Sequence, residues 1–240
     1  MSNEHLIQGI EILCKNDSEI ESLITPRKDE ILSLLERYIN EIELFNPAYG
    51  LVGTNNTEEL VIKHILDSLA PLGLISRLFS PLSSAKSVPC AHPFQFHAAD
   101  AGSGAGLPGI PLAIALPFCE VSLIERMGRR AGFLFNTKAA LSLSNITIEE
   151  SELEKIKNKQ YNLVTFRAFK PLEPKLLRTL FNICAPNGVI AAYKGKREKI
   201  EAEMAALLAA LPITEIQWEA IPYNVPFLDE ERHILVISHK

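Results

Sequence analysis

The first 75 residues place hydrophobic side chains at the three- and four-residue spacing of amphipathic helices. From Arg27 to Phe45 these positions fall on one helical face, and Asn46-Pro47 is expected to end that helix. Thr57 is expected to cap the following helix. That helix carries six residues on a single face: Leu60, Val61, His64, Ile65, Ser68 and Leu69. Residues 1–75 are therefore predicted to form a helical cap.

Residues 76–95 are rich in Ser and Pro and show no clear period, so they are predicted to be an irregular connection. From residue 96 onward, short hydrophobic runs typical of strands alternate with helical patterns. The strands are expected at Phe96–Asp100, Val121–Glu125, Asn145–Glu149, Asn162–Arg167 and Val189–Lys194. The helices are expected at Pro111–Leu116, Arg129–Leu143, Glu173–Cys184 and Glu198–Leu211. This alternation predicts a parallel sheet covered by helices.

The end of the chain changes this pattern. Two strand-like runs, Ile213–Ile221 and His233–Ser238, are joined by a loop that contains two prolines and no helix. A hairpin of this kind leaves the last strand antiparallel beside an otherwise parallel sheet. We therefore predict an α/β domain over residues 96–240, with a seven-stranded, mostly parallel sheet and the helical cap as an N-terminal extension.

Composition fits one large domain with such an extension, since the 240 residues are 47% hydrophobic and 22% charged. No stretch approaches the roughly 20 apolar residues of a membrane span, and Met1 to Ile10 lacks the basic start of a secretory signal. The cysteines lie far apart at Cys14, Cys90, Cys119 and Cys184, which argues against a zinc site and a disulfide framework. We expect a cytoplasmic monomer without metal or membrane contact.

The net charge of −5 is unusual for a protein that binds naked nucleic acid through counterion release. Any nucleic-acid role would then depend on a local basic patch or on a larger ribonucleoprotein surface. Taken alone, the negative net charge argues against an RNA substrate.

The densest candidate for chemistry is Asp100-Ala-Gly-Ser-Gly-Ala-Gly-Leu-Pro-Gly109, which follows the first expected strand. Four glycines within eight residues indicate a loop whose backbone approaches a ligand closely, because side chains would block that approach. The loop fits two patterns. Gly104 to Gly109 matches G-x-G-x-x-G of dinucleotide sites, and Gly102 to Gly106 matches G-x-G-x-G of S-adenosylmethionine (AdoMet)-dependent methyltransferases.

Two residues favour the second pattern. In a dinucleotide site, Pro108 would lie among the N–H groups that hold the pyrophosphate, and proline has no N–H to donate. Asp100 would place a carboxylate beside an anionic ligand, whereas AdoMet offers it an ammonium group and a sulfonium cation. The hairpin ending agrees, since dinucleotide domains more often close with a further parallel unit. The loop thus predicts a class I methyltransferase fold, with Asp100, Gly102 and Gly104 at the methyl donor.

Residues at the carboxyl ends of the later strands are further candidates, because open α/β sheets bind ligands there. Glu125 ends the second strand and is placed to accept hydrogen bonds from ribose hydroxyls, and Ser151 to Glu154 follows the third and is placed to pack on adenine. Arg167 ends the fourth strand between two phenylalanines, and unpaired buried charge is costly. It is expected to pair with Asp100 or Glu125, to contact the cofactor, or to hold substrate. Lys194 adds positive charge to the same edge.

His64 and Asp67 lie three residues apart and so share a helical face. They fit either a structural His–Asp pair at the domain junction or a part of the site. The spacing of the other His, Cys, Asp and Glu residues indicates no metal site, and no serine triad is apparent.

Several motifs, in this order along the chain, resemble the family of glucose-inhibited division protein B, the bacterial 16S rRNA methyltransferase G. They are Asn46-Pro-Ala-Tyr49, His64-Ile-Leu-Asp-Ser68, Asp100 to Pro111, Arg167-Ala-Phe169, Lys194-Gly195 and Glu231-Arg-His233. The resemblance runs from about Arg27 to the C-terminus. The chain departs from it at Gly50-Leu-Val52, where the family has Asn-Leu-Thr or Asn-Leu-Ser, and in its longer 76–95 segment.

The resemblance implies AdoMet-dependent methylation of guanine N7 in 16S rRNA, in a loop near the decoding centre. It implies a substrate within the small ribosomal subunit or an assembly intermediate, with AdoMet as methyl-donor co-substrate. It places cofactor contacts at Gly102, Leu107, Glu125, Arg126, Met127, Leu153, Glu154 and Arg167.

Guanine N7 carries an in-plane lone pair, so its methylation needs alignment with the methyl group rather than a general base. We expect Arg167, Lys194 and Arg232 to hold guanine O6 or nearby phosphates of a base splayed out of its stack. Three other readings stay open: a methyltransferase acting on a small molecule or protein, an NAD-dependent oxidoreductase, and a binding module that keeps the fold without catalysis.

Overall fold

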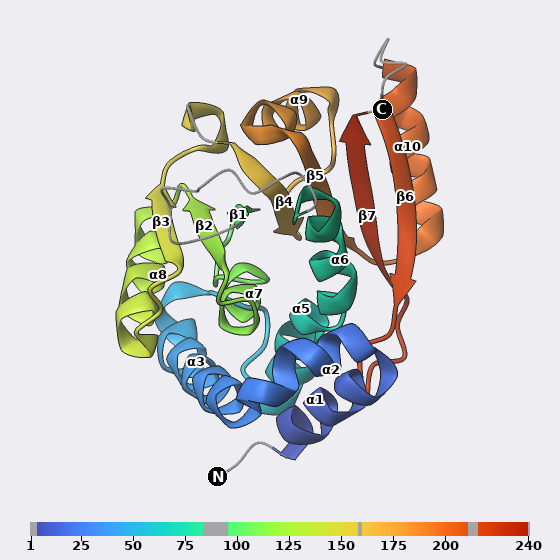
Figure 1. Ribbon diagram of the computed structural model, residues 1–240. Coiled ribbons are helices and arrows are strands. Elements are labelled where there is room, and N and C mark those ends of the chain that lie inside the picture. The colour runs from blue at the N-terminus through green and yellow to red at the C-terminus, as the bar shows by residue number, and fades with distance from the viewer. Residues whose placement is uncertain (1–3, 84–95, 158–159, 211–215, 240) are drawn as a thin grey trace.

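The computed structural model describes residues 4–83, 96–157, 160–210 and 216–239, and its centre is a seven-stranded sheet (Figure 1). The strand order is β3-β2-β1-β4-β5-β7-β6. β1 to β5 are parallel, whereas β7 is antiparallel to both β5 and β6, so the predicted mostly parallel sheet is confirmed. The strands are β1 (Phe96–Ala101), β2 (Cys119–Glu125), β3 (Ile146–Glu150), β4 (Tyr161–Arg167), β5 (Cys184–Lys194), β6 (Ile216–Tyr223) and β7 (Arg232–His239).

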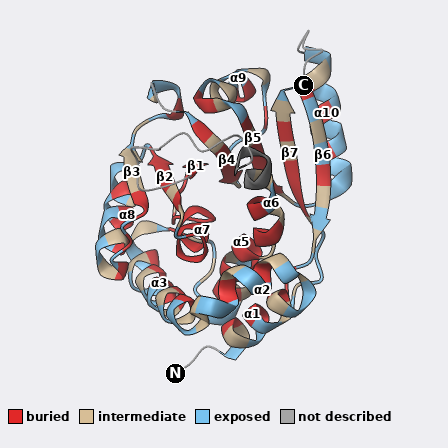
Figure 2. Ribbon diagram, in the orientation of Figure 1, coloured by how far each residue is buried: buried red, intermediate tan, exposed pale blue. Residues whose placement is uncertain are grey.

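Successive residues of a strand point to opposite faces of the sheet. Both faces are hydrophobic here, because consecutive residues in the central strands are apolar. Figure 2 shows the buried strands at the centre of the molecule. One core receives Ala98, Leu163 and Ile234, and the other receives their chain neighbours Ala99, Val164 and Leu235. The helices that cover the second core are α9 (Pro174–Ile183) and α10 (Arg197–Ala210), and η3 (Leu153–Lys155) lies beside α9.

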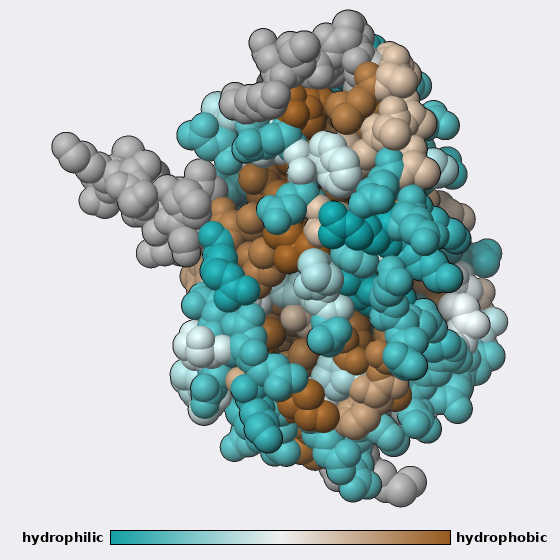
Figure 3. Space-filling model, turned by 90° about the vertical axis from the view of Figure 1, so that its right-hand side faces the viewer, coloured by the Kyte–Doolittle hydropathy of each residue, from teal (hydrophilic) through white to brown (hydrophobic). Residues whose placement is uncertain are grey.

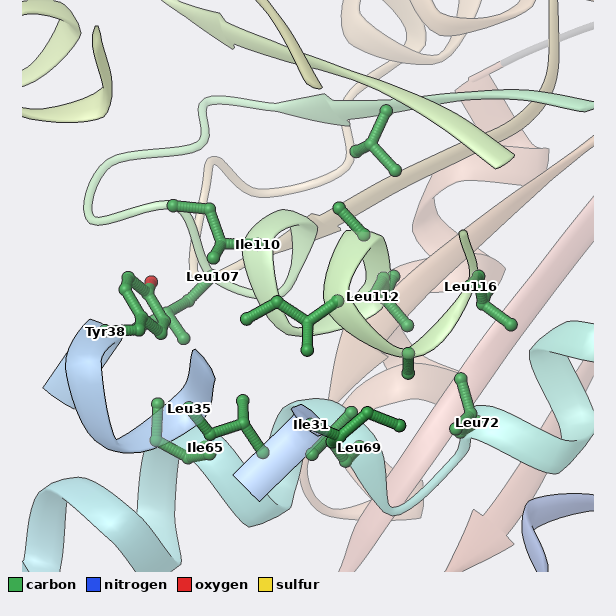
Figure 4. Close-up of a cluster of buried hydrophobic side chains, with 14 of the residues drawn as sticks. Ile31, Leu35, Tyr38, Ile65, Leu69, Leu72, Leu107, Ile110, Leu112 and Leu116 are labelled. Carbon is green, nitrogen blue, oxygen red and sulfur yellow. The ribbon is translucent and has the colours of Figure 1, made fainter. Parts of the chain in front are cut away.

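The first core is shared between the sheet and the N-terminal helices. α7 (Gly109–Ala115) is buried along its whole length, and it packs together with α8 (Gly128–Leu141) against the sheet. In Figure 4, Leu35 and Tyr38 lie beside Leu107, within the glycine loop, and Ile110, directly after it. The N-terminal elements are α1 (Glu4–Asn16), α2 (Ser18–Ile24), η1 (Thr25–Arg27), α3 (Lys28–Tyr49), α4 (Thr57–Leu60), η2 (Val61–Leu66, a π-helical turn), α5 (Asp67–Leu69) and α6 (Leu72–Ser83).

Two predicted helix boundaries in this region are wrong. α3 does not stop at Asn46-Pro47 but continues to Tyr49, and Gly50 ends it with a left-handed φ of 59°. The side chain of Asn46 binds the loop that follows, and this tertiary contact outweighs the local effect of the proline. Asn56, not Thr57, caps α4, because its Oδ1 accepts a hydrogen bond from the Glu59 N–H at 2.8 Å.

The irregular connection expected at residues 76–95 is wrong for its first part, since α6 extends to Ser83. α6 packs on β4 and β5 with Leu72 and Ile75 buried, so burial outweighs the Ser/Pro-rich composition. Residues 84–95 lie outside the described part of the chain, as does the expected start of β6 at Ile213. The division into a cap and a sheet domain stays a prediction.

The face on the side of α10 and β6 is mostly hydrophilic, and hydrophobic side chains show there as patches between polar ones (Figure 3). Of the helices in the described residues, none is both long enough and apolar enough to cross a membrane.

Candidate active site at the carboxyl ends of the strands

A cavity of about 880 Å³ opens at the carboxyl ends of β1, β4 and β5, beside the π-helical turn η2. The strand order reverses between β1 and β4, and open α/β sheets bind ligands at such a point. Leu51 and Val52 also line the cavity, so the apolar Val52 lies where the family resemblance implied Thr or Ser. Six of the predicted site residues line it: Gly102, Gly104, Leu107, Arg167, Lys194 and Arg232.

The glycine loop forms one wall of the cavity, and three of its glycines have a left-handed backbone. The φ angles are 72° at Gly102, 59° at Gly104 and 90° at Gly106. A Cβ at Gly102 would collide with the ring of Phe169, and one at Gly106 would collide with Ile110. At Gly104 the nearest atoms to such a Cβ are 3.9 Å away. Gly104 therefore presents bare backbone to open space, as a close-fitting ligand requires.

Asp100 lies buried beneath this loop and does not line the cavity. Its Oδ2 accepts hydrogen bonds from the Ser103 hydroxyl at 2.6 Å and the Gly109 N–H at 3.0 Å. Burial raises the pKa of Asp100 to about 6, although both hydrogen bonds favour the charged form. Its Oδ1 has no hydrogen-bond partner among the described residues. Asp100 thus joins the two ends of the loop and keeps one acceptor available.

Glu125 holds the loop from the neighbouring strand. Its two carboxylate oxygens accept from the Gly104 N–H at 3.0 Å and the Met127 N–H at 2.8 Å. The other residues implied to bind the cofactor follow β2 and β3 in the chain and do not line the cavity. They are Arg126, Met127, Leu153 and Glu154, of which only Leu153 is buried.

Arg167 pairs with neither Asp100 nor Glu125, so that sequence-based expectation is corrected. Its Nη1 donates to Asp67 Oδ2 and to the Lys63 carbonyl, both at 3.0 Å. Its Nη2 donates to Nδ1 of His64 at 2.8 Å. His64 and Asp67 both contact this guanidinium and line the cavity, which fits the second of the two alternatives, a part of the site, rather than a structural His–Asp pair.

The other two predicted basic residues are also paired. Arg232 places Nε 3.3 Å from Asp67 Oδ1 and donates from Nη1 to Glu230 at 3.0 Å. Lys194 donates to both carboxylate oxygens of Glu203, at 2.9 and 2.7 Å. All three cations thus enter the cavity wall with partly offset charge.

His64 is held neutral in this wall. Desolvation, followed by the nearby Arg167 charge, lowers the pKa of His64 to about 4. Its Nδ1 is consequently available as an acceptor for Arg167.

Sequence reasoning missed two features of this site. The three-residue spacing placed Asp67 on the same helical face as His64. It did not indicate the contacts of Asp67 to Arg167 and Arg232, which lie far away in the chain. Phe169 appeared only as a neighbour of Arg167, whereas its ring covers Gly102. Ala168, just before it, adopts a left-handed φ of 49°, which the sequence does not indicate. Over the described ranges, no group of three or more His, Cys, Asp and Glu is arranged to hold a metal ion.

Known proteins are similar in sequence to this protein along nearly its whole length. The family model described as rRNA small subunit methyltransferase G matches residues 31–235. Ribosomal RNA small subunit methyltransferase G of Treponema denticola is 36% identical over 253 residues, covering 99% of this chain and 95% of that protein. The protein of the same name from Treponema pallidum subsp. pallidum is 38% identical over 211 residues, covering 86% of this chain and 85% of that protein.

A solved structure supports the fold independently. The SAM dependent methyltransferase from Aquifex aeolicus matches with a TM-score of 0.51 at 15% identity, covering 72% of this chain and 91% of that one. The likeness confirms the predicted class I methyltransferase architecture.

Proposed function

The chain belongs to the rRNA small subunit methyltransferase G family, and from that premise we propose that it transfers the methyl group of AdoMet to N7 of a guanine in 16S rRNA. The observation that supports this most directly is the glycine loop at the switch point of the sheet. Gly104 exposes bare backbone there, beside a cavity lined by three basic side chains from strand ends.

The residues around the loop fit AdoMet. The open space over Gly104 accepts a ligand that lies against the backbone. Oδ1 of Asp100, to which no described residue donates a hydrogen bond, leaves a buried acceptor for a cationic group. Bound AdoMet supplies an electrophilic methyl group on a positively charged sulfur. We assign its binding to the residues around the loop and the ends of β2 and β3: Asp100, Gly102, Gly104, Leu107, Glu125, Arg126, Met127, Leu153, Glu154 and Arg167.

The reaction does not require the protein to transfer a proton. The N7 lone pair forms the new bond to carbon while the carbon–sulfur bond breaks, and its electrons return to sulfur. Positive charge moves from sulfur to the guanine ring, and no proton has to leave N7. The work of the chain is alignment, which can lower a barrier by about 7–11 kcal/mol in favourable cases. Arg167, Lys194 and Arg232 would hold guanine O6 or adjacent phosphates for that alignment.

The substrate class and setting follow from the same premise. Methylation of 16S rRNA takes place where ribosomal subunits assemble, so we propose that the protein works in the cytoplasm, as a monomer, on the small subunit or an assembly intermediate.

A methyl-transfer assay tests the proposal. Purified protein is incubated with tritiated AdoMet and small subunits from cells lacking the gene, and 7-methylguanosine is mapped by borohydride–aniline cleavage. We expect label in 16S rRNA and one new cleavage site. Label in protein or small molecules, or methylated RNA that resists cleavage, would contradict the proposal. Thermal stabilisation by NAD but not by AdoMet would point to an oxidoreductase instead.

A further inference from the structure

Asp67 is the one carboxylate among the described residues that line the cavity, where it lies with several basic side chains. From its contacts we infer that Asp67 is a positioning residue for methyl transfer. It fixes the spacing of Arg167 and Arg232 and offsets their charge beside the target guanine. The inference rests on the proposed function, because it requires a guanine in this cavity.

The geometry is that of one carboxylate shared by two guanidinium groups. Oδ2 of Asp67 lies 3.0 Å from Arg167 Nη1, and Oδ1 lies 3.3 Å from Arg232 Nε. The three side chains are only 6%, 13% and 18% exposed, respectively. Two guanidinium charges this close repel each other, and they do so more strongly away from water. Asp67 bridges the two guanidinium groups and offsets part of this repulsion.

Asp67 itself is fixed by neighbours from other elements. The Tyr223 hydroxyl donates to Oδ1 of Asp67 at 3.0 Å, from the end of β6. The Tyr193 hydroxyl donates to the carbonyl of the adjacent Ser68 at 2.9 Å, from β5. Asp67 begins α5, directly after the π-helical turn η2, and such turns are frequent at functional sites. The Lys63 carbonyl of that turn accepts from Arg167, so turn and carboxylate hold the same guanidinium.

The charge of Asp67 matters because the base becomes positive during the reaction. A guanine that gains a methyl group at N7 carries positive charge that nearby guanidinium groups would disfavour. Asp67 offsets part of that repulsion, and Glu230 does the same for the outer side of Arg232. Binding of the RNA phosphates is not helped by Asp67, because phosphates are attracted by positive charge and repelled by a carboxylate. Asp67 should therefore serve turnover and not affinity.

The test is Asp67→Asn, which keeps the side-chain size and removes the charge. Rates of tritiated methyl transfer are measured against AdoMet and small-subunit concentration, and subunit binding is measured by sedimentation. We expect kcat to fall about 10- to 100-fold, as for other losses of alignment. The KM for AdoMet should stay close to that of the wild type, and subunit binding should be equal or tighter. Asp67→Glu should recover part of the lost kcat.

Asp17→Asn is the matched control. Asp17 also pairs with an arginine, at 3.2 Å from Arg77, in the same layer of N-terminal helices, but it does not line the cavity. Asparagine keeps its role as helix cap, so kcat should match the wild type. If Asp67→Asn keeps the wild-type kcat, or loses kcat and subunit binding together, Asp67 is not a positioning residue for turnover.

Two further measurements keep the outcomes distinct. If Asp67→Asn does not fold, Tyr223→Phe decides, since it removes only the hydroxyl that donates to Asp67. It should lower kcat by a smaller factor at unchanged subunit binding, and a wild-type kcat would overturn the inference. The wild-type protein is assayed alongside. Its failure to methylate 16S rRNA would overturn the proposed function itself.

Discussion

Gly102 and Gly104 share a left-handed backbone but differ in what surrounds them. Alanine at either position costs about 1–2 kcal/mol in backbone strain. At Gly102 the new methyl group would also collide with Phe169, adding about 1–3 kcal/mol of overpacking. Gly102→Ala should therefore lower the free energy of unfolding more than Gly104→Ala, as measured by urea titration. Gly104→Ala should chiefly weaken AdoMet binding in calorimetry, because its methyl group projects into open space.

Gly132→Ala is the control for both variants. Gly132 lies in α8, and nothing lies within 4 Å of a Cβ built there. Alanine in a helix is favoured over glycine by roughly 1 kcal/mol, so this variant should be slightly more stable and bind AdoMet normally. Equal AdoMet affinity in Gly104→Ala and the wild type would show that the loop does not approach the ligand as we propose.

His64 gives a pH-dependent prediction. In the unfolded chain it takes up a proton below about pH 6.5, while burial beside Arg167 lowers the pKa of the folded His64 to about 4. The unfolded state binds more protons between these values, so His64 weakens folding there and not above pH 6.5. His64→Gln removes this effect and should gain up to about 2 kcal/mol relative to the wild type between pH 7 and pH 5.

Thermal unfolding of both proteins from pH 7 to pH 5 measures that gain, which corresponds to a shift of roughly 4–8 °C. The pKa of Asp100, which burial raises to about 6, affects both proteins equally and cancels in the difference. A difference in melting temperature that does not change with pH would contradict a neutral, buried His64.

Single residues also show where sequence reasoning ends. A charged residue between two phenylalanines requires a partner, and Arg167, largely shielded from solvent, has partners, although they are not the expected Asp100 or Glu125. Its partner, Asp67, is a hundred positions away, and only the folded chain brings the start of α5 to the end of β4. Composition and spacing carry no information on such a contact.

Among the elements, α3 supports the site from behind, because it contacts the glycine loop although none of its residues lines the cavity. The Tyr38 hydroxyl, fully buried, donates to the Ala105 carbonyl of the glycine loop at 2.7 Å. Tyr38→Phe leaves that carbonyl without its donor, which costs about 1–3 kcal/mol. We expect a melting temperature lower by several degrees and weaker AdoMet binding, measured by calorimetry. Tyr49→Phe on the same helix is the control, and equal losses in both variants would contradict an anchoring role for Tyr38.

The order of the elements was predictable because the spacing of apolar residues reflects which face of each helix or strand is buried. In this protein the helices and strands bury those faces in the two cores. Each of the seven strands lies where an apolar run predicted one, but β5 begins at Cys184, five residues before the expected Val189 and where a helix was expected to end. The expected start of β6 at Ile213 lies outside the described residues. Helix ends were less predictable, since they depend on single contacts: Asn46 carries α3 past Pro47, and Asn56 takes the cap expected of Thr57. The π-helical turn η2 has no sequence signal at all, although it aims the Lys63 carbonyl at Arg167.

At the scale of the whole molecule, charge is unevenly distributed. The chain carries a net charge of −5, yet the cavity wall includes Lys63, Arg130, Lys170 and the three basic residues assigned to the site. The N-terminal helices and the strand ends build this wall jointly, so neither part has the site alone. A basic cavity wall in a chain of net negative charge suits a partner whose RNA is presented locally by a larger particle.

This distribution predicts a preference between two forms of one substrate. An extended free RNA would meet mostly acidic surface, whereas a folded subunit can present one loop to the cavity while ribosomal proteins shield its other phosphates. Initial rates of methyl transfer should therefore be higher on assembled or partly assembled small subunits than on protein-free 16S rRNA. Raising the salt concentration should weaken subunit binding modestly, because the proposed site would contact only a few phosphates. Faster methylation of protein-free 16S rRNA under the same conditions would show that the local basic wall suffices without the particle.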